Sequence, residues 1–251
     1  MSAFWQAVGF LTRFPVPKKG QTLEGWERSP RYYPLIGLLI GLAVWLVMEL
    51  AKLGFGTGSG AAVAATLTVA FWIYATGALH LDGWMDLADG LGSQRGRERA
   101  LEIMKDSRVG AMGVVAAIVL LLLKTAAVYH LAVSGAVACL PLVPAMARGA
   151  LLLAMRVFPY IKEKGLGSDL RQGVTGPVLA FNGLLLGAVA FAMAGWQGLL
   201  VLALVLAAAW LFGLSIMRKL GGFTGDVYGA LIEGAETLAL LALLLSHIHL
   251  S

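Results

Sequence analysis

The sequence predicts an all-α, polytopic membrane helix bundle: a single integral membrane domain, residues 1–251, with about seven transmembrane helices. Hydrophobic residues make up 59% of the chain and charged residues 13%, against about 25% charged in a typical soluble domain. The mean hydropathy is +0.82. Since a spanning helix needs roughly 20 apolar residues, a chain of this length has room for about six to eight of them.

Residues 1–17 precede the first apolar run and predict a short amphipathic helix in the lipid headgroup region. The segment lacks the basic start of a secretory signal, and Pro15 and Pro17 end its helical pattern. A disordered tail is the alternative. The apolar side chains that would enter the membrane surface are Phe4, Trp5, Phe10, Leu11 and Phe14.

Seven apolar runs then supply the predicted spans. The connections after the first, third and fifth runs are short, whereas those after the second, fourth and sixth are longer and carry the polar residues. A turn at Gly195 and Trp196 separates the fifth run from the sixth. The runs cover approximately residues 32–53, 60–81, 112–133, 135–155, 178–194, 197–217 and 230–250.

Charge placement predicts the orientation of the bundle. The lysines and arginines of the loops fall on the side of the N-terminus, and the opposite side has only Lys52, at the end of the first span. By the positive-inside rule the side of the N-terminus is cytoplasmic, and seven spans leave the C-terminus outside. The net charge of +5 is spread over loops without a basic stripe, which argues against nucleic acid as a partner and for membrane lipid.

Glu49, Lys124 and Arg148 lie inside the predicted spans, where ionisable groups are usually paired or functional. Glu49 and Lys124 fall in the outer half of the membrane, and we expect them to pair with each other. Arg148 lies in the inner half of its helix and could reach a cytoplasmic pocket. The single cysteine, Cys139, excludes an intramolecular disulfide and is expected in the core.

The stretch HLDGWMDLADG, residues 80–90, carries Asp82, Asp86 and Asp89. Their spacing of four and then three residues places the carboxylates within about 60° on one face of a helix. Like charges on one face repel unless a cation lies among them, and hard oxygen ligands suit Mg²⁺ bound together with substrate phosphates. A solvated acidic helix end is the alternative. We therefore expect a metal and phosphate site at the cytoplasmic end of the second span.

Two cytoplasmic segments, residues 82–111 and 217–236, are expected to form the active site. In the first, Asp106 lies beside basic residues and just before two glycines, which makes it a site candidate. In the second, GGFTGDVYGALIEGAE, the glycines permit a tight turn close to a bound anion, and we expect Asp226 to be functional. The two glutamates there either serve the site or cap the last helix. The substrate-binding candidates are Arg95, Lys105, Arg108, Gly222, Thr224, Gly225, Glu233 and Glu236, with Lys162, Lys164 and Arg171 as further basic candidates.

The motifs HLDGWMDLADGL, LEIMKDSRVGAMG and GGFTGDVYGA, in this order, closely resemble the cobalamin synthase family (adenosylcobinamide-GDP ribazoletransferases, also called cobalamin-5′-phosphate synthases). The early stretches FLTRFPVP and RYYPLIGLLIG are similar to that family too, so the resemblance covers most of the chain. It implies a Mg²⁺-dependent enzyme of the cell inner membrane with its active site facing the cytoplasm. Such an enzyme joins adenosylcobinamide-GDP to α-ribazole or its 5′-phosphate and releases GMP.

For that reaction the three aspartates of HLDGWMDLADG would hold Mg²⁺ on the diphosphate, with Asp106 or Asp226 completing the metal shell. His80 or one of the aspartates would accept the proton of the attacking ribosyl hydroxyl. Capping or packing at the helix end is the alternative role of His80. The catalytic candidates are Asp82, His80 and Asp106, and the metal candidates are Asp82, Asp86, Asp89 and Asp226.

Other functions stay open at this point. A CDP-alcohol phosphotransferase or a prenyltransferase would use similar metal chemistry, although the chain lacks the Ala-Arg that follows Asp-Gly in the CDP-alcohol signature. A corrinoid or nucleoside transporter would place charged groups near the bilayer midplane, whereas the acids here cluster at one face. Analysis of the products separates these classes. Whether the chain forms a homo-oligomer is also left open.

Overall fold

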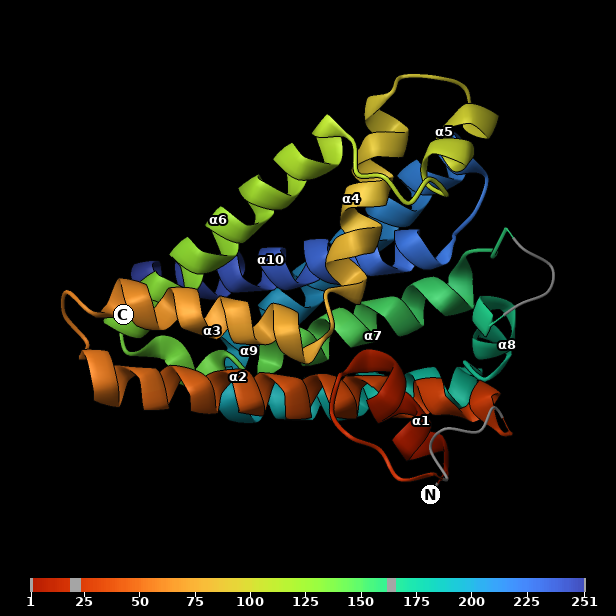
Figure 1. Ribbon diagram of the computed structural model, residues 1–251. Helices are drawn as coiled ribbons and strands as arrows, with labels where there is room; N and C mark the ends of the chain where they lie inside the picture. The colour runs from red at the N-terminus through yellow and green to blue at the C-terminus, as the bar shows by residue number, and fades with distance from the viewer. Residues whose placement is uncertain (1, 19–23, 162–165, 251) are drawn as a thin grey trace.

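The computed structural model describes residues 2–18, 24–161 and 166–250, which are almost entirely helical (Figure 1). Among these residues the strand-like pairing is limited to one isolated β-bridge between Tyr160 and Phe223. The all-α prediction is therefore confirmed. In chain order the elements are α1 (Ser2–Leu11), the 3₁₀ helix η2 (Trp26–Tyr32), α2 (Tyr33–Phe55), α3 (Ala61–Ala75), α4 (Leu79–Gly92), α5 (Arg97–Ile103), α6 (Ala111–Val133), the 3₁₀ helix η3 (Ala136–Cys139), α7 (Leu142–Val157), α8 (Leu166–Gln172), α9 (Gly176–Leu220) and α10 (Gly225–Leu250).

Within the described chain, five helices are long and apolar enough to cross a membrane, or six if the bent pair α3 and α4 counts as one span. The chain is accordingly a multi-pass membrane protein, and the predicted number of about seven spans is approximate. Both α2 and α6 match the first and third predicted runs to within a few residues, because each lies in one uninterrupted apolar stretch. The five helices cover Trp26–Phe55, Ala111–Val133, Ala136–Val157, Gly176–Leu220 and Gly225–Ser246.

The long helix α9 folds back on itself as a hairpin. Ala194 (φ −139°, ψ 15°) and Gly195 (φ 56°, ψ −144°) leave the helical conformation in its middle. A Cβ built on Gly187 lies 3.9 Å from the side chain of Leu199, although residues this far apart in a straight helix are separated by about 18 Å along the axis. The two arms of α9 therefore correspond to the fifth and sixth predicted runs.

The prediction that residues 60–81 form one continuous helix is wrong. The chain bends by 89° between Ala75, where α3 ends, and Leu79, where α4 begins. Gly77 (φ 64°) and Ala78 (φ 56°) are both left-handed, a conformation that disfavours alanine by roughly 1–2 kcal/mol. Hydropathy does not reveal the bend, because the residues on both sides of it are apolar. HLDGWMDLADG thus belongs to a separate helix, α4, and not to the end of a straight span.

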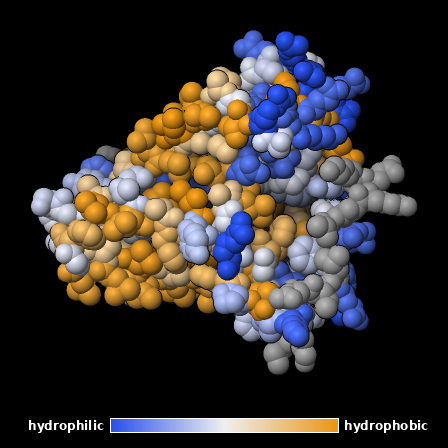
Figure 2. All heavy atoms as spheres, in the orientation of Figure 1, coloured by the Kyte–Doolittle hydropathy of each residue, from blue (hydrophilic) through white to orange (hydrophobic). Residues whose placement is uncertain are grey.

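The helices α2, α3, α7 and α10 run lengthwise through the molecule, and α4 crosses them (Figure 1). Apolar side chains cover the length of the bundle, whereas polar side chains collect at the end that holds α5 and α8 (Figure 2). We call this the polar end. The helix α1 lies near it, and α10 finishes at the opposite end (Figure 1). That the polar end faces the cytoplasm stays a prediction.

The N-terminal segment forms the expected short helix, α1, which packs on η2 and α2. Leu11 is fully buried, and the ring of Phe10 stacks on Tyr33 of α2 with 6.1 Å between centroids. Two of the side chains expected to enter the membrane surface therefore face the protein. The position of α1 in the headgroup layer stays a prediction.

Candidate active site

Two glycines let α4 and α10 cross with their backbones in contact. A Cβ built on Gly83 of α4 would lie 2.5 Å from the carbonyl oxygen of Asp226, closer than real Cβ atoms approach. A Cβ built on Gly229 of α10 would lie 3.1 Å from the carbonyl oxygen of His80. The crossing joins the two acidic segments, and Asp82 and Asp226 consequently line the same cavity.

Asp82, Asp86 and Asp226 form an acidic cluster at this crossing. The pKa of Asp86 is raised from 3.8 to about 6, first because burial disfavours its charged form and then because the carboxylates of Asp82, Asp226 and Asp89 lie nearby. Among the described residues, no three His, Cys, Asp or Glu side chains enclose a position for a metal ion. A Mg²⁺ ion shared with substrate phosphates needs only one or two protein carboxylates, so the donor set fits that kind of site.

Asp89 caps α6. Its Oδ2 accepts a hydrogen bond from the Gly110 N–H at 2.7 Å, and its Oδ1 accepts one from the Gly113 N–H at 2.8 Å. These amides begin α6, where the first N–H groups have no partner within the helix. Asp89 is one of the predicted metal ligands, but in the structure both of its oxygens serve the helix N-terminus.

A cavity of about 220 Å³ lies between α1, α2, α4, α7, α8 and α10, beside the acidic cluster; we call it the inner cavity. Cavities that combine apolar walls with a few polar groups are the usual form of small-molecule sites. The ionisable residues around it are His80, Asp82, Tyr160, Asp226, Tyr228 and Tyr33. The other side chains that line it are Phe10, Leu11, Leu79, Leu151, Met155, Leu170 and Ile232.

His80 lines the inner cavity and is almost fully buried. Its Nδ1 lies 3.4 Å from Nη2 of Arg148, which has no exposed surface. An arginine side chain only donates hydrogen bonds, so Nδ1 accepts and the ring proton is carried by Nε2. Held this way, His80 can donate a hydrogen bond into the cavity, but it has no free lone pair with which to take a proton. The predicted role of His80 as proton acceptor therefore lacks support, and packing at the helix end describes it better.

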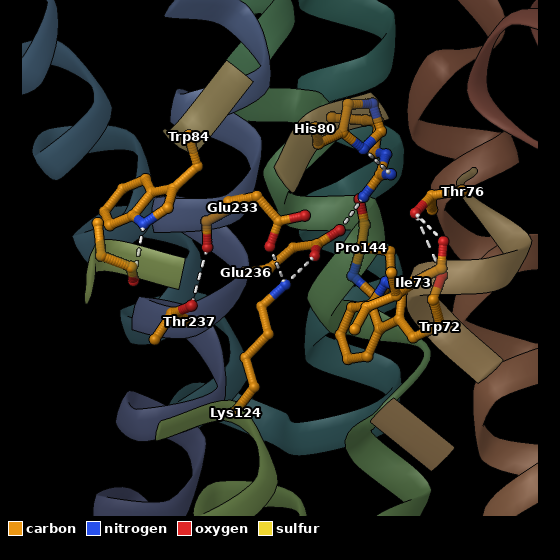
Figure 3. Close-up of polar contacts among 12 residues, drawn as sticks. Trp72, Ile73, Thr76, His80, Trp84, Lys124, Pro144, Glu233, Glu236 and Thr237 are labelled. Carbon is orange, nitrogen blue, oxygen red and sulfur yellow. Dashed lines mark hydrogen bonds and ion pairs between the residues drawn. The ribbon is translucent and has the colours of Figure 1, made fainter. Parts of the chain in front are cut away.

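A buried charge cluster lies beside His80 (Figure 3) and is formed by Lys124 of α6, Arg148 of α7, and Glu233 and Glu236 of α10. The Lys124 ammonium donates to Glu233 and, at 2.7 Å, to Glu236, whose other oxygen accepts from Arg148. None of the four side chains is more than 8% exposed. Two positive charges face two negative ones, so each buried ion has the partner that it needs away from water.

The charge cluster bears on two expectations. Glu233 and Glu236, predicted to bind substrate, are turned into the bundle and are absent from the described residues that line the inner cavity. Lys124 pairs with these two glutamates and not with Glu49, whose partner is Lys52 at 3.0 Å. The pairing partners lie far apart in the sequence, and only the packing of α6, α7 and α10 brings them together. The charged residues inside the predicted spans indicated that buried charges are present, but they did not indicate which residues pair with each other.

In the turn into α10, two of the three residues predicted to bind substrate, Thr224 and Gly222, make contacts within the protein. The Thr224 hydroxyl accepts a hydrogen bond from the Val227 N–H and lies 3.3 Å from Asp226 Oδ2, so it caps the helix and contacts a site carboxylate. A Cβ on Gly222 would lie 2.9 Å from the Pro159 carbonyl oxygen, so the close approach serves the protein and not an anion. Gly225 alone of these three predicted contacts lines the inner cavity.

The basic residues predicted to meet the phosphates are not among the described residues that line the inner cavity. Arg95, Lys105 and Arg108 are exposed. Arg108 is bound to Asp106 through hydrogen bonds of 3.0 and 2.7 Å, and these bonds lower the pKa of Asp106 to about 2. The structure thus places Asp106 in a surface ion pair and not beside Asp82.

A wider cavity of about 530 Å³, the outer cavity, adjoins the inner one and shares Met155 and Tyr160 with it. Arg156 and Arg171 line it, and Arg171 Nε donates to the Met155 carbonyl oxygen at 3.0 Å. Of the basic candidates, Arg171 therefore lies near the acidic cluster. The predicted Lys162 and Lys164 lie outside the described residues.

Three residues of the site, Arg156, Tyr160 and Tyr228, were absent from the predicted set. The rings of Tyr160 and Tyr228 stack with 5.8 Å between centroids and line the inner cavity. Each tyrosine lies beside a polar turn at the end of an apolar run, and this was the signal available in the sequence.

The chain is similar to the members of one family over nearly its whole length. Residues 3–244 match the profile of a family described as cobalamin-5-phosphate synthase. Relatives from Brevibacillus brevis, Desulfitobacterium hafniense and Pseudomonas putida, each named adenosylcobinamide-GDP ribazoletransferase, are 44%, 40% and 41% identical. The alignments cover 97%, 96% and 98% of this chain and 98%, 96% and 99% of the relatives. No solved structure matches it.

Proposed function

Because the chain belongs to the cobalamin-5-phosphate synthase family, we propose that it transfers the phosphocobinamide group of adenosylcobinamide-GDP to α-ribazole or α-ribazole 5′-phosphate. A ribosyl hydroxyl oxygen of the acceptor forms a bond to the phosphorus next to cobinamide. The bond between that phosphorus and the bridging oxygen breaks, and GMP leaves with this oxygen. The hydroxyl proton passes to a carboxylate, and the product is adenosylcobalamin or its 5′-phosphate.

The observation that carries the proposal is the α4–α10 crossing, at which an acidic cluster borders one largely apolar cavity. The adjoining outer cavity, which carries two arginines, suits a diphosphate, because arginine binds phosphate oxygens through paired N–H donors. A nucleoside and a diphosphate could thus meet at Asp82 and Asp226.

Mg²⁺ would be held by one or two carboxylates of the acidic cluster, Asp82, Asp86 and Asp226, together with substrate phosphates. Burial is the first cause of the raised pKa of Asp86, and the nearby carboxylates are the second; a cation would relieve the repulsion of these carboxylates, which supports the assignment. When bound, the ion neutralises the diphosphate and the charge that develops on the leaving oxygen. His80 would donate from Nε2 to a substrate oxygen, so the acceptor of the hydroxyl proton is one of the aspartates. We place this site at the cytoplasmic face of the inner membrane, because the basic loop residues lie on that side.

The reaction is tested by GMP release from adenosylcobinamide-GDP and α-ribazole with the purified protein and Mg²⁺. We expect Asp82→Asn and Asp226→Asn each to lower turnover by about a hundredfold or more, the scale of losing one preorganised electrostatic contact. Glu102→Gln, which alters an exposed pair with Arg99, is the matched control and should retain wild-type turnover. Substrate uptake into proteoliposomes without GMP release would overturn the transferase and favour a transporter.

A further inference from the structure

We propose that the inner cavity binds the apolar bicyclic base of the acceptor nucleoside and holds its ribose toward Asp82 and Asp226. The inference rests on the proposed function and adds to it a binding subsite and the chemical feature that this subsite recognises. The base of α-ribazole is dimethylbenzimidazole, a flat and largely apolar ring system. One ring nitrogen carries the ribose, and the other is a hydrogen-bond acceptor.

The walls of the inner cavity have the character that such a base requires. Two stacked aromatic pairs contribute to it, Phe10 with Tyr33 and Tyr160 with Tyr228. Aromatic faces favour a planar ring beside them. Ile232 and the other aliphatic side chains on the lining complete an apolar surface.

The size of the inner cavity restricts what can enter it. Its volume of about 220 Å³ is below the roughly 300 Å³ at which pockets for whole drug-sized ligands begin. A corrin ring is far too large for it, whereas one bicyclic base is a suitable part of a ligand. The guanine of the other substrate carries several polar groups, and unpaired polar groups are strongly disfavoured against apolar walls.

Tyr228 supplies the feature that distinguishes a benzimidazole from an apolar ring in general. Its side chain is 7% exposed, and its hydroxyl has no hydrogen-bond partner within the described part of the chain. Tyr228 lines the inner cavity, and buried hydroxyls are normally bonded, so its unpaired hydroxyl indicates a partner that the described part of the chain does not supply. The free ring nitrogen of the base is an acceptor for this O–H, and this bond would fix the orientation of the ribose.

The test is a binding cycle on the purified full-length protein, which needs no turnover. Equilibrium dialysis measures the Kd of α-ribazole and of the matching α-riboside of dimethylindole, which lacks the acceptor nitrogen. We expect Tyr228→Phe to weaken α-ribazole binding about three- to tenfold, the effect of one neutral hydrogen bond, and to leave binding of the indole riboside unchanged. Tyr74→Phe, the same change at an exposed position of α3, should alter neither Kd.

A second variant tests the position of the base without relying on the hydrogen bond. Ile232→Phe narrows the cavity. It should weaken the binding of α-ribazole more than the binding of the riboside of unsubstituted benzimidazole, because the two methyl groups need the space that is lost. The subsite is refuted if wild-type protein does not bind α-ribazole. The subsite is also refuted if Tyr228→Phe changes the Kd of both ribosides equally. If α-ribazole binds as expected but no GMP is released from adenosylcobinamide-GDP, the proposed reaction fails and the subsite stands.

Discussion

Replacing Glu236 by glutamine should be among the most destabilising single changes in the bundle. Its carboxylate bonds both Lys124 and Arg148, and all three side chains are at most 4% exposed. Glutamine keeps the size of the side chain but removes the charge, so the cluster changes from neutral to a net charge of +1. Breaking one partner of a buried ion pair typically lowers the free energy of unfolding by about 3–5 kcal/mol. That is a large part of the roughly 5–15 kcal/mol that stabilises a typical protein.

The assay is unfolding in mixed detergent–SDS micelles, followed by the loss of helical circular dichroism. Glu49→Gln makes the same chemical change in a partly exposed pair with Lys52, and should lower stability by only about 0–1 kcal/mol. The double variant Glu236→Gln/Arg148→Met restores neutrality to the cluster, so it should recover part of the loss. The reasoning is refuted if Glu236→Gln and Glu49→Gln cost the same, or if the double variant is less stable than expected from adding its two single changes.

Three further predictions concern the acidic crossing. Gly83→Ala should push α4 away from Asp226 and lower GMP release at least tenfold, whereas Gly183→Ala, where a Cβ meets nothing within 4 Å, should leave it unchanged. For Asp86, the pKa near 6 means that the folded state binds a proton more tightly than the unfolded state, so stability without Mg²⁺ should fall as pH rises from about 4 to 6. Thermal unfolding of Asp86→Asn should lack this fall and respond less to Mg²⁺, and an unchanged pH slope would contradict the assignment. Asp89→Ala should cost about 1–2 kcal/mol through loss of the α6 cap while keeping the response to Mg²⁺; loss of that response would return Asp89 to the metal site.

The spanning helices were predictable because an uninterrupted apolar run is a property of the sequence alone. The third predicted run, residues 112–133, agrees with α6 for this reason. The bend at Gly77 and Ala78 was not predictable in the same way. It depends on two left-handed residues inside an apolar stretch, and nothing in the hydropathy distinguishes them. The result is that α4 has the predicted aspartates but not the predicted direction.

The acidic half of the candidate site was predicted from the spacing of Asp82 and Asp86 and from the glycine-rich turn before Asp226. The aromatic half of the candidate site was not predicted. Tyr160 and Tyr228 have no characteristic spacing, and their relevance becomes visible only when α10 and the segment after α7 pack together. The partner of Lys124 was equally hidden, because ion pairs between helices depend on how those helices pack and not on sequence distance.

The charge cluster also sets a condition on the biogenesis of the protein. Lys124 precedes Glu233 by 109 residues, and Arg148 precedes Glu236 by 88. At a synthesis rate of about 5–20 residues per second, both cations wait on the order of 5–20 s in the nascent chain before their partners are made. A chain that stops before α10 retains two buried positive charges with no counter-charge from that helix. Completion of the last helix is thus the step that supplies the counter-charges of this cluster.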